Sequence, residues 1–110
     1  MTTSHSVAEV ATERPSRYGK QLVAHLGRRN GGEWSDDDQQ GWIAFADGRA
    51  VLSCDASTLH LQVEGPKEAL PGLEDVVGRH LVRFGARDEL VVRWVRSDGT
   101  AGLERRNTED

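Results

Sequence analysis

The sequence predicts a two-layer α+β domain, in which an antiparallel sheet of about five strands carries two helices packed on one face. Three observations predict this class. Several short segments alternate apolar and polar residues, two longer segments repeat apolar residues at helical spacing, and short turns join the middle strands. The expected order of elements is β-α-β-β-β-α-β.

The first two elements are a strand and a helix. Residues 7–12 alternate as a short strand, which ends before Pro15 because proline restricts the residue that precedes it. Ser16 is expected to cap the helix, since a serine side chain accepts a hydrogen bond from a free amide of the first turn. The helix should end near residues 28–29, before Asn30 and two glycines. Its apolar face consists of Tyr18, Leu22 and Leu26, with His25 beside them.

The middle of the chain is expected to form an antiparallel meander. The apolar period changes to 2 at Trp34 and continues, past an aspartate-rich loop, to residue 46. Asp47 and Gly48 predict a hairpin, because this pair accepts the positive φ angles of a type I′ turn. Residues 50–54 pair back, and residues 59–63 add a strand with one polar face.

A second helix and a final strand complete the predicted domain. The helix should run from Leu73 to Phe84, because Pro71 would interrupt an earlier start, and Gly85 should cap it. Residues 90–95 alternate as the last strand. The polar ends, residues 1–5 and 98–110, are expected to be a disordered N-terminus and a flexible tail around a single domain at residues 6–97. This order of elements is similar to TATA-binding-protein-like and helix-grip arrangements.

Composition excludes several classes of protein. The 110 residues include 14 basic and 18 acidic side chains, and the net charge of −4 disfavours nucleic-acid binding. The longest apolar run, Trp42 to Ala46, is too short to cross a membrane, and the polar N-terminus does not resemble a signal peptide. The single cysteine, Cys54, excludes an internal disulfide, so a reducing cytoplasm is the expected location. We expect Cys54 to be an inert core thiol.

Each predicted helix has a line of polar residues beside its apolar stripe. If the helices lie side by side, the two lines face each other across a groove. Such a groove favours an anion, because guanidinium groups bind carboxylates and phosphates and histidine adds a donor. The alternative is structural, with solvated arginines, an Arg79–Asp75 ion pair and histidines bonded to backbone. The polar lines are Arg17, Gln21, His25 and Arg28 on the first helix, and His80, Arg83 and Arg87 on the second.

Metal binding and catalysis are less favoured by the sequence. His25 and His80 are the candidate metal ligands, with Cys54 or a carboxylate as a third. All four histidines stand alone, however, without the His-x-x-x-His spacing of a metal-binding helix, so we predict no metal and no cofactor. The aspartates at 36–38 lack calcium-loop spacing and are expected to be solvated. An enzyme with a histidine acid or base ranks last, because phosphate-loop and nucleophile-elbow signatures are missing.

Several motifs carry a resemblance to a known family. They are residues 10–22 with His25, Gly41-x-Ile-x-Phe45, Asp47-Gly48 with Leu52, His80-Leu-x-Arg-Phe84, Arg87-x-Glu-Leu90 and Trp94. Over residues 6–95 the chain resembles a bacterial family called domain of unknown function 2218. Members of this family are sometimes found beside or fused to siderophore-interacting, iron-uptake proteins. The resemblance therefore implies a role near ferric-siderophore handling.

The resemblance also implies a set of ligand-binding residues. Leu26 and Arg28 depart from the family pattern, which often has an aromatic residue and a further histidine there. The leading hypothesis is a non-catalytic cytoplasmic module that binds an anionic small molecule or a ferric siderophore, and charge reversal at Arg83 should abolish that binding. The alternative is a protein-interaction module that docks on a siderophore-interacting reductase through a sheet face or an edge strand. The positions that match the family's polar signature are Arg17, Tyr18, Lys20, Gln21, His25, His80, Arg83 and Arg87.

Overall fold

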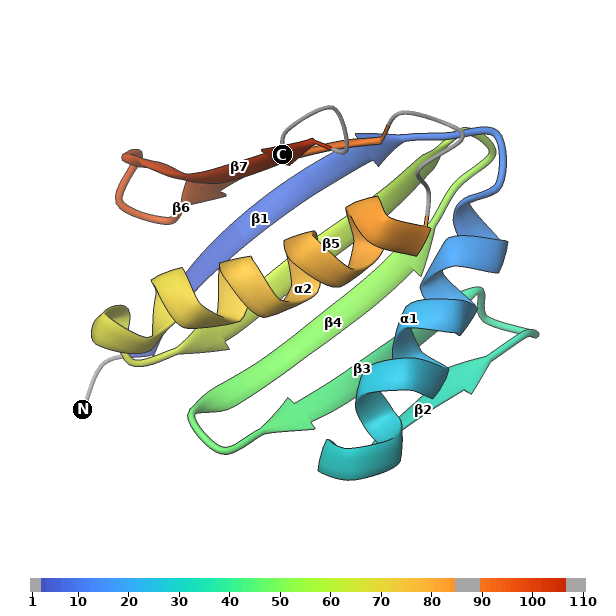
Figure 1. The fold of residues 1–110 in the computed structure, drawn as a ribbon, viewed down its shortest axis with the longest axis horizontal. Coiled ribbons are helices and arrows are strands. Elements are labelled where there is room, and N and C mark those ends of the chain that lie inside the picture. The colour runs from blue at the N-terminus through green and yellow to red at the C-terminus, as the bar shows by residue number, and fades with distance from the viewer. Residues whose placement is uncertain (1–2, 85–89, 107–110) are drawn as a thin grey trace.

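The computed structural model describes residues 3–84 and 90–106, which form two layers (Figure 1). All strand pairs in the sheet are antiparallel, and the strand order is β2-β3-β4-β5-β1-β6-β7. Both α-helices lie on the same face of this sheet. The strands are β1 (Ser4–Ala11), β2 (Gly32–Ser35), β3 (Gln40–Phe45), β4 (Gly48–Cys54), β5 (Thr58–Gly65), β6 (Val91–Arg96) and β7 (Ala101–Arg106). The helices are α1 (Pro15–Asn30), the short 3-10 helix η1 (Lys67–Ala69) and α2 (Leu70–Phe84).

The α+β class and the antiparallel sheet are confirmed, but the expected number of strands is wrong. The sheet of the described residues has seven strands rather than about five. The turn at residues 36–39 separates β2 from β3, whereas the sequence predicts a single strand that continues past the aspartate-rich loop. The other additional strand, β7, lies inside the segment expected to be a flexible tail. At the opposite end β1 already begins at Ser4, within the segment expected to be disordered.

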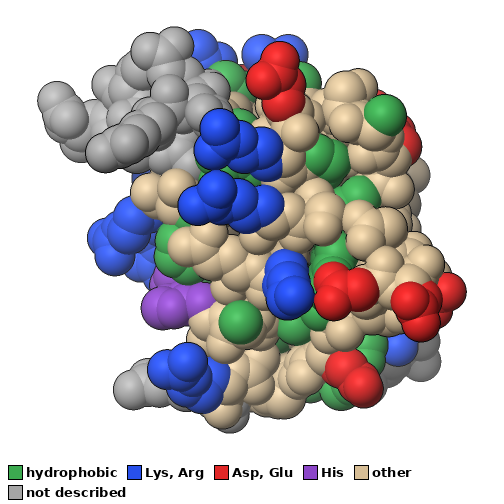
Figure 2. Space-filling view, turned by 90° about the vertical axis from the view of Figure 1, so that its right-hand side faces the viewer, with side chains coloured by type: hydrophobic (Ala, Val, Ile, Leu, Met, Phe, Trp, Pro, Cys, Tyr) green, Lys and Arg blue, Asp and Glu red, His purple; other side chains and the backbone are tan. Residues whose placement is uncertain are grey.

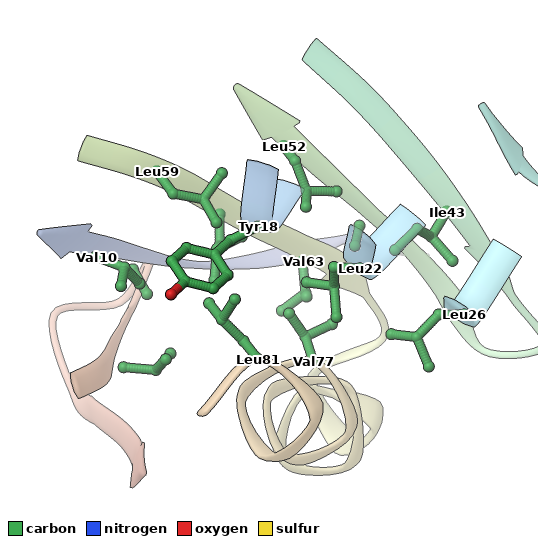
Figure 3. Close-up of a cluster of buried hydrophobic side chains, with 14 of the residues drawn as sticks. Val10, Tyr18, Leu22, Leu26, Ile43, Leu52, Leu59, Val63, Val77 and Leu81 are labelled. Atoms are coloured by element: carbon green, nitrogen blue, oxygen red, sulfur yellow. The ribbon is translucent and has the colours of Figure 1, made fainter. Parts of the chain in front are cut away.

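The core lies between the sheet and the two helices (Figure 3). Tyr18, Leu22 and Leu26 are buried, which agrees with the apolar face predicted for α1. His25, at the edge of that face, stays exposed. Val77 and Leu81 extend the same core from α2. The two helices therefore bury their apolar stripes on the sheet and leave their polar edges accessible.

The reverse face of the sheet has no helix on it in the described part of the chain (Figure 1). In β1, Ala8 and Val10 are buried on the helix side, whereas Val7 and Glu9 point the other way and are exposed. Among the described residues, the large hydrophobic side chains that remain exposed are Val7, Trp42, Val91 and Val95.

The helix ends differ from the prediction for reasons of proline chemistry. The N-cap of α1 is Arg14 rather than Ser16, and Pro15 begins the helix because a residue there needs no amide donor. The same reason lets α2 begin at Leu70 and include Pro71, so the predicted start at Leu73 is wrong. The glycine end of α1 is confirmed, since Gly31 caps it with φ 93°. The predicted cap Gly85 lies outside the described residues. Neither α-helix described here is long and apolar enough to cross a membrane.

The hairpin between β3 and β4 is confirmed, but its predicted turn type is wrong. Phe45 pairs with Gly48, so Ala46 and Asp47 occupy the centre of the turn. Neither has a positive φ, which excludes a type I′ turn. The glycine at position 48 is explained by close packing rather than by turn conformation, because a Cβ atom there would overlap with the carbonyl oxygen of Glu64 on β5.

Candidate functional site

His25 on α1 and His80 on α2 lie against each other. Their ring centroids are 5.1 Å apart, and the ring planes are tilted by 43°. Phe84, one turn after His80, meets the His25 ring edge to face with a centroid distance of 5.3 Å. The sequence placed the two histidines at the polar edges of separate helices, and the fold brings them into one cluster.

An open groove lies beside this histidine pair. It has a volume of about 490 Å³. Residues from the last turns of α1 and from the middle of α2 line it. Arg28 is exposed there and contributes a guanidinium group, whereas Leu26 and Val76 add apolar surface. The lining residues are His25, Leu26, Arg28, Asn30, Val76 and His80.

The orientation of His80 is fixed by its own helix. Its Nδ1 lies 2.7 Å from the carbonyl oxygen of Val76. Because a carbonyl oxygen only accepts hydrogen bonds, Nδ1 is the nitrogen that carries hydrogen, and Nε2 is left for another partner. The alternative to a ligand groove, in which the polar residues of the helices have structural roles only, predicts a histidine bonded to backbone. It also predicts the ion pair of Arg79 with Asp75, whose Nε–Oδ2 distance is 4.0 Å. The backbone contact thus orients His80 without using both of its nitrogens.

The charge distribution favours an anion on the helix side of the molecule. The sequence of α1 contains four basic residues, Arg17, Lys20, Arg28 and Arg29, and no acidic residue, although the net charge of the whole chain is −4. In Figure 2 a histidine lies close to Lys and Arg side chains on the left, which is the helix side, whereas acidic side chains gather on the right. Clustered charge of one sign raises the local concentration of oppositely charged ligands.

The structure does not bring every predicted site residue to this groove. Tyr18 is buried in the core, near Val10 and Leu81 (Figure 3). Lys20 forms an ion pair with Asp36, at an Nζ–Oδ2 distance of 3.4 Å, and lines a separate groove with Trp34. Arg17, Gln21 and Arg83 are exposed on their helices but do not line the groove. Arg87 lies outside the described residues.

Sequence reasoning missed Glu74, which is fully buried. Its carboxylate accepts hydrogen bonds from Ser6 Oγ at 2.6 Å, from Arg96 Nε and Nη2 at 3.0 and 2.9 Å, and from the Leu103 amide at 3.1 Å. Burial raises the pKa of Glu74, but these hydrogen bonds outweigh burial and lower the pKa below its ordinary value. The sequence does contain a signal for the burial of Glu74. It lies four residues after Leu70 and three before Val77, which places it within the apolar stripe of α2. With both oxygens bonded inside the protein, Glu74 is a structural anchor.

Cys54 does not have the properties of a reactive thiol. It is half-buried and packs against the core. Burial and the neighbouring Asp55 carboxylate raise the pKa of the Cys54 thiol, which reduces its thiolate fraction. Within the described ranges, no group of three or more His, Cys, Asp or Glu side chains is arranged to hold a metal ion.

The fold and groove define a small two-layer α+β domain with a candidate ligand site between its helices. A family model described as an uncharacterised protein conserved in bacteria (DUF2218) matches residues 7–95, and the chain belongs to this family. The NMR structure of PA4090 from Pseudomonas aeruginosa is similar, with 29% identity, coverage of 76% of this chain and 84% of that chain, and a TM-score of 0.60. A search of curated proteins finds no match. The family resemblance is therefore confirmed, whereas its siderophore context stays a prediction.

Proposed function

We propose that this protein is a non-catalytic module that binds a small anionic ligand in the groove between α1 and α2. The observation that carries the proposal is the histidine pair, with ring centroids 5.1 Å apart, beside Arg28 in an open groove. Arg28 supplies a planar fork of donors and His25 offers a ring N–H at the same place, whereas the ring N–H of His80 is bonded to the Val76 carbonyl. Arg28 and His25 therefore offer hydrogen to a carboxylate, phosphate or similar group, and His80 forms part of the groove wall beside them.

The groove also suits a ligand with an apolar portion. Its volume of about 490 Å³ is within the range of small-molecule sites in proteins. Leu26 and Val76 line it, and Phe84 packs against His25. The family context favours an anionic iron–siderophore complex as the ligand, and this remains part of the proposal. Arg17, Gln21 and Arg83 would then serve as outer contacts rather than groove walls.

An NMR titration tests the proposal directly. The ¹⁵N-labelled protein is titrated in metal-free buffer with potassium phosphate, citrate and gallium-loaded siderophores. Saturable shifts are expected at His25, His80 and their neighbours. Arg28→Gln should weaken binding at least about tenfold, because it removes a charge-assisted hydrogen bond. Arg49→Gln is the matched control, since Arg49 is exposed on the reverse face and should leave affinity unchanged.

Two results would overturn anion binding in this groove. The first is the absence of saturable shifts with every anion of the panel. The second is an equal loss of affinity in the Arg28 and Arg49 variants, which would indicate a general effect of net charge. Arg83→Glu tests the wider site, and unchanged affinity in that variant would remove Arg83 from it.

The reverse face of the sheet supports a second candidate function, docking of a protein partner. The strand register places Trp42, Val51, Gln62, Val7 and Val95 in one row across β3, β4, β5, β1 and β6. Trp42, Val7 and Val95 are 43%, 44% and 47% exposed. An exposed apolar surface of this kind often marks an interaction site. The family context makes a siderophore-interacting reductase the candidate partner.

Size-exclusion chromatography with such a reductase tests this second function. Co-elution is expected with the unaltered protein and should be lost in Val95→Lys, which places a charge at the β6 end of the apolar row, on its most exposed valine. Arg49→Gln, outside that row, should still co-elute. If the unaltered protein and the reductase elute separately, the reductase is not the partner.

A further inference from the structure

We propose that His25 and His80 also form a coordination site for a divalent transition-metal ion such as Zn²⁺. The site takes one imidazole ligand from each helix. It goes beyond anion binding, because a metal ion bound by two imidazoles does not require the anion. The inference rests on the distance between the rings, the bond that orients His80 and the open groove beside them.

The distance between the two rings fits a shared metal ion. Zinc binds histidine nitrogen at about 2.0–2.1 Å with tetrahedral geometry, which places the centroids of two coordinated imidazole rings about 5.2 Å apart. The observed separation of the His25 and His80 centroids is 5.1 Å. The separation of the two rings therefore matches that of two imidazoles bound to one ion.

The hydrogen bond of His80 prepares this ring for coordination. Metal-binding histidines commonly donate one ring N–H to a backbone carbonyl or carboxylate, which orients the ring and leaves the other nitrogen for the metal. His80 Nδ1 makes such a bond to the Val76 carbonyl, at 2.7 Å. Nε2 of His80 is therefore the ligand atom. His25 is exposed, so its ring can adjust to the ion without disturbing the core.

The number of protein ligands indicates what kind of site this is. In the part of the chain that the structure describes, no third His, Cys, Asp or Glu side chain joins the pair. Two imidazoles leave coordination positions open to the groove, as in sites where a metal exchanges its outer ligands. Imidazole suits Zn²⁺, Cu²⁺ and Ni²⁺ better than Mg²⁺ or Ca²⁺. Oxygen atoms of an anion would fill the open positions, and Arg28 would pair with the negative charge of that anion.

The other two histidines provide internal controls. His60 lies on the reverse face, with Nε2 2.9 Å from Asp55 Oδ2 and Nδ1 3.9 Å from Glu9 Oε1. Both of its nitrogens already face carboxylates. His5 is similarly engaged, with Nε2 3.1 Å from Glu64 Oε2. Non-specific binding of a metal ion to histidine would involve any of the four histidines, whereas the proposal predicts binding at His25 and His80 only.

The test is a titration of the full chain with ZnCl₂ in chelator-stripped, phosphate-free buffer. Long-range ¹H–¹⁵N NMR spectra report the ring nitrogens of each histidine. We expect saturable binding at one equivalent, with the ring-nitrogen shifts confined to His25 and His80. His25→Gln and His80→Gln should each weaken binding at least about tenfold, since loss of even an outer-shell partner weakens metal sites by 10- to 100-fold. His60→Gln should leave affinity unchanged.

The outcomes separate this inference from the proposed function. The exposed position of His25 means that His25→Gln should keep the native amide spectrum, so loss of zinc binding there reports a lost ligand rather than unfolding. Loss of zinc binding in His60→Gln, or zinc binding that does not saturate, would overturn the metal site. Anion shifts that persist in metal-free buffer would still support the anion groove. Zinc binding at His25 and His80 without any anion binding would support the metal site alone.

Discussion

Glu74 and Arg96 form a bidentate ion pair in which the carboxylate is completely buried. Arg96 Nε lies 3.0 Å from Glu74 Oε2, and Arg96 Nη2 lies 2.9 Å from Glu74 Oε1. Ser6 of β1 and the Leu103 amide of β7 bond to the same carboxylate. One side chain of α2 therefore joins three strands, which are β1, β6 and β7.

We expect Arg96→Leu to destabilise the protein by about 3–5 kcal/mol, because removal of one partner leaves a buried charge without compensation. Chemical denaturation with urea measures this loss of unfolding free energy. Arg93→Leu is the matched control on the same strand. Arg93 is exposed and pairs with Glu104 at 2.8 Å, so its loss should change stability by less than about 1 kcal/mol. Equal effects of the two variants would contradict the anchoring role of Glu74.

The same carboxylate should make stability depend on pH in the acid range. Because the pKa of Glu74 is lowered on folding, the ionised form is the one that the native state favours. Its contribution is complete above the ordinary glutamate pKa of about 4.3 and is lost as pH falls through the lower pKa of the folded state. Glu74→Gln should therefore be less stable than the unaltered protein at pH 7, and the gap should narrow on acidification.

Urea unfolding of the two proteins between pH 7 and pH 3 measures this gap. Other carboxylates also have lowered pKa values, including Asp55 through its hydrogen bond from His60. Their effect is common to both proteins and is removed by the comparison. A gap that stays constant with pH would show that the Glu74 carboxylate contributes no pH dependence.

Truncation after Ser97 distinguishes the structure from the sequence prediction of a flexible tail. A tail could be removed without consequence, whereas β7 pairs with β6 from Val91 to Val95 and supplies the Leu103 amide to Glu74. We expect the truncated chain to lose at least about 2 kcal/mol, because a buried carboxylate loses a donor and a strand loses its neighbour. Thermal denaturation followed by circular dichroism measures the difference. An unchanged melting temperature would restore the tail interpretation.

The case of β7 shows why part of the fold could not be predicted. Its only large apolar residue is Leu103, so no alternating period exists to detect. The strand depends on backbone pairing and on the contact with Glu74, which lies 29 residues away in sequence. By contrast, α2 and β5 bury their apolar residues at regular spacing, and that spacing predicted both elements, although α2 begins at Leu70 rather than Leu73.

The candidate site was predictable only in part, for a similar reason. Helical spacing placed His25 and His80 at the edges of two apolar stripes, and both are accessible there. Spacing within one helix cannot give the distance between residues of two helices, which depends on how both pack on the sheet. Tyr18 shows that one residue can carry two sequence signals: the helical spacing placed it on the apolar face, where it is buried, and the family motif implied ligand contact. The similarity to TATA-binding-protein-like or helix-grip arrangements stays a prediction.

Gly48 and Gly72 should respond in opposite directions to the same substitution. A Cβ atom at Gly48 would overlap with the Glu64 carbonyl of the adjacent strand, a backbone atom that cannot move aside without disturbing the β4–β5 pairing. Gly48→Ala should therefore destabilise the protein by at least about 2 kcal/mol. Gly72 has no atom within 4 Å of such a Cβ and lies in the first turn of α2.

Gly72→Ala should accordingly stabilise the protein by up to about 1 kcal/mol, because alanine favours the helix and restricts the unfolded chain. Urea unfolding of both variants provides the measurement. Opposite signs are expected, since the helix at Gly72 leaves room for a methyl group and the sheet at Gly48 does not. Stabilisation by Gly48→Ala would mean that β4 and β5 approach less closely than the structure shows.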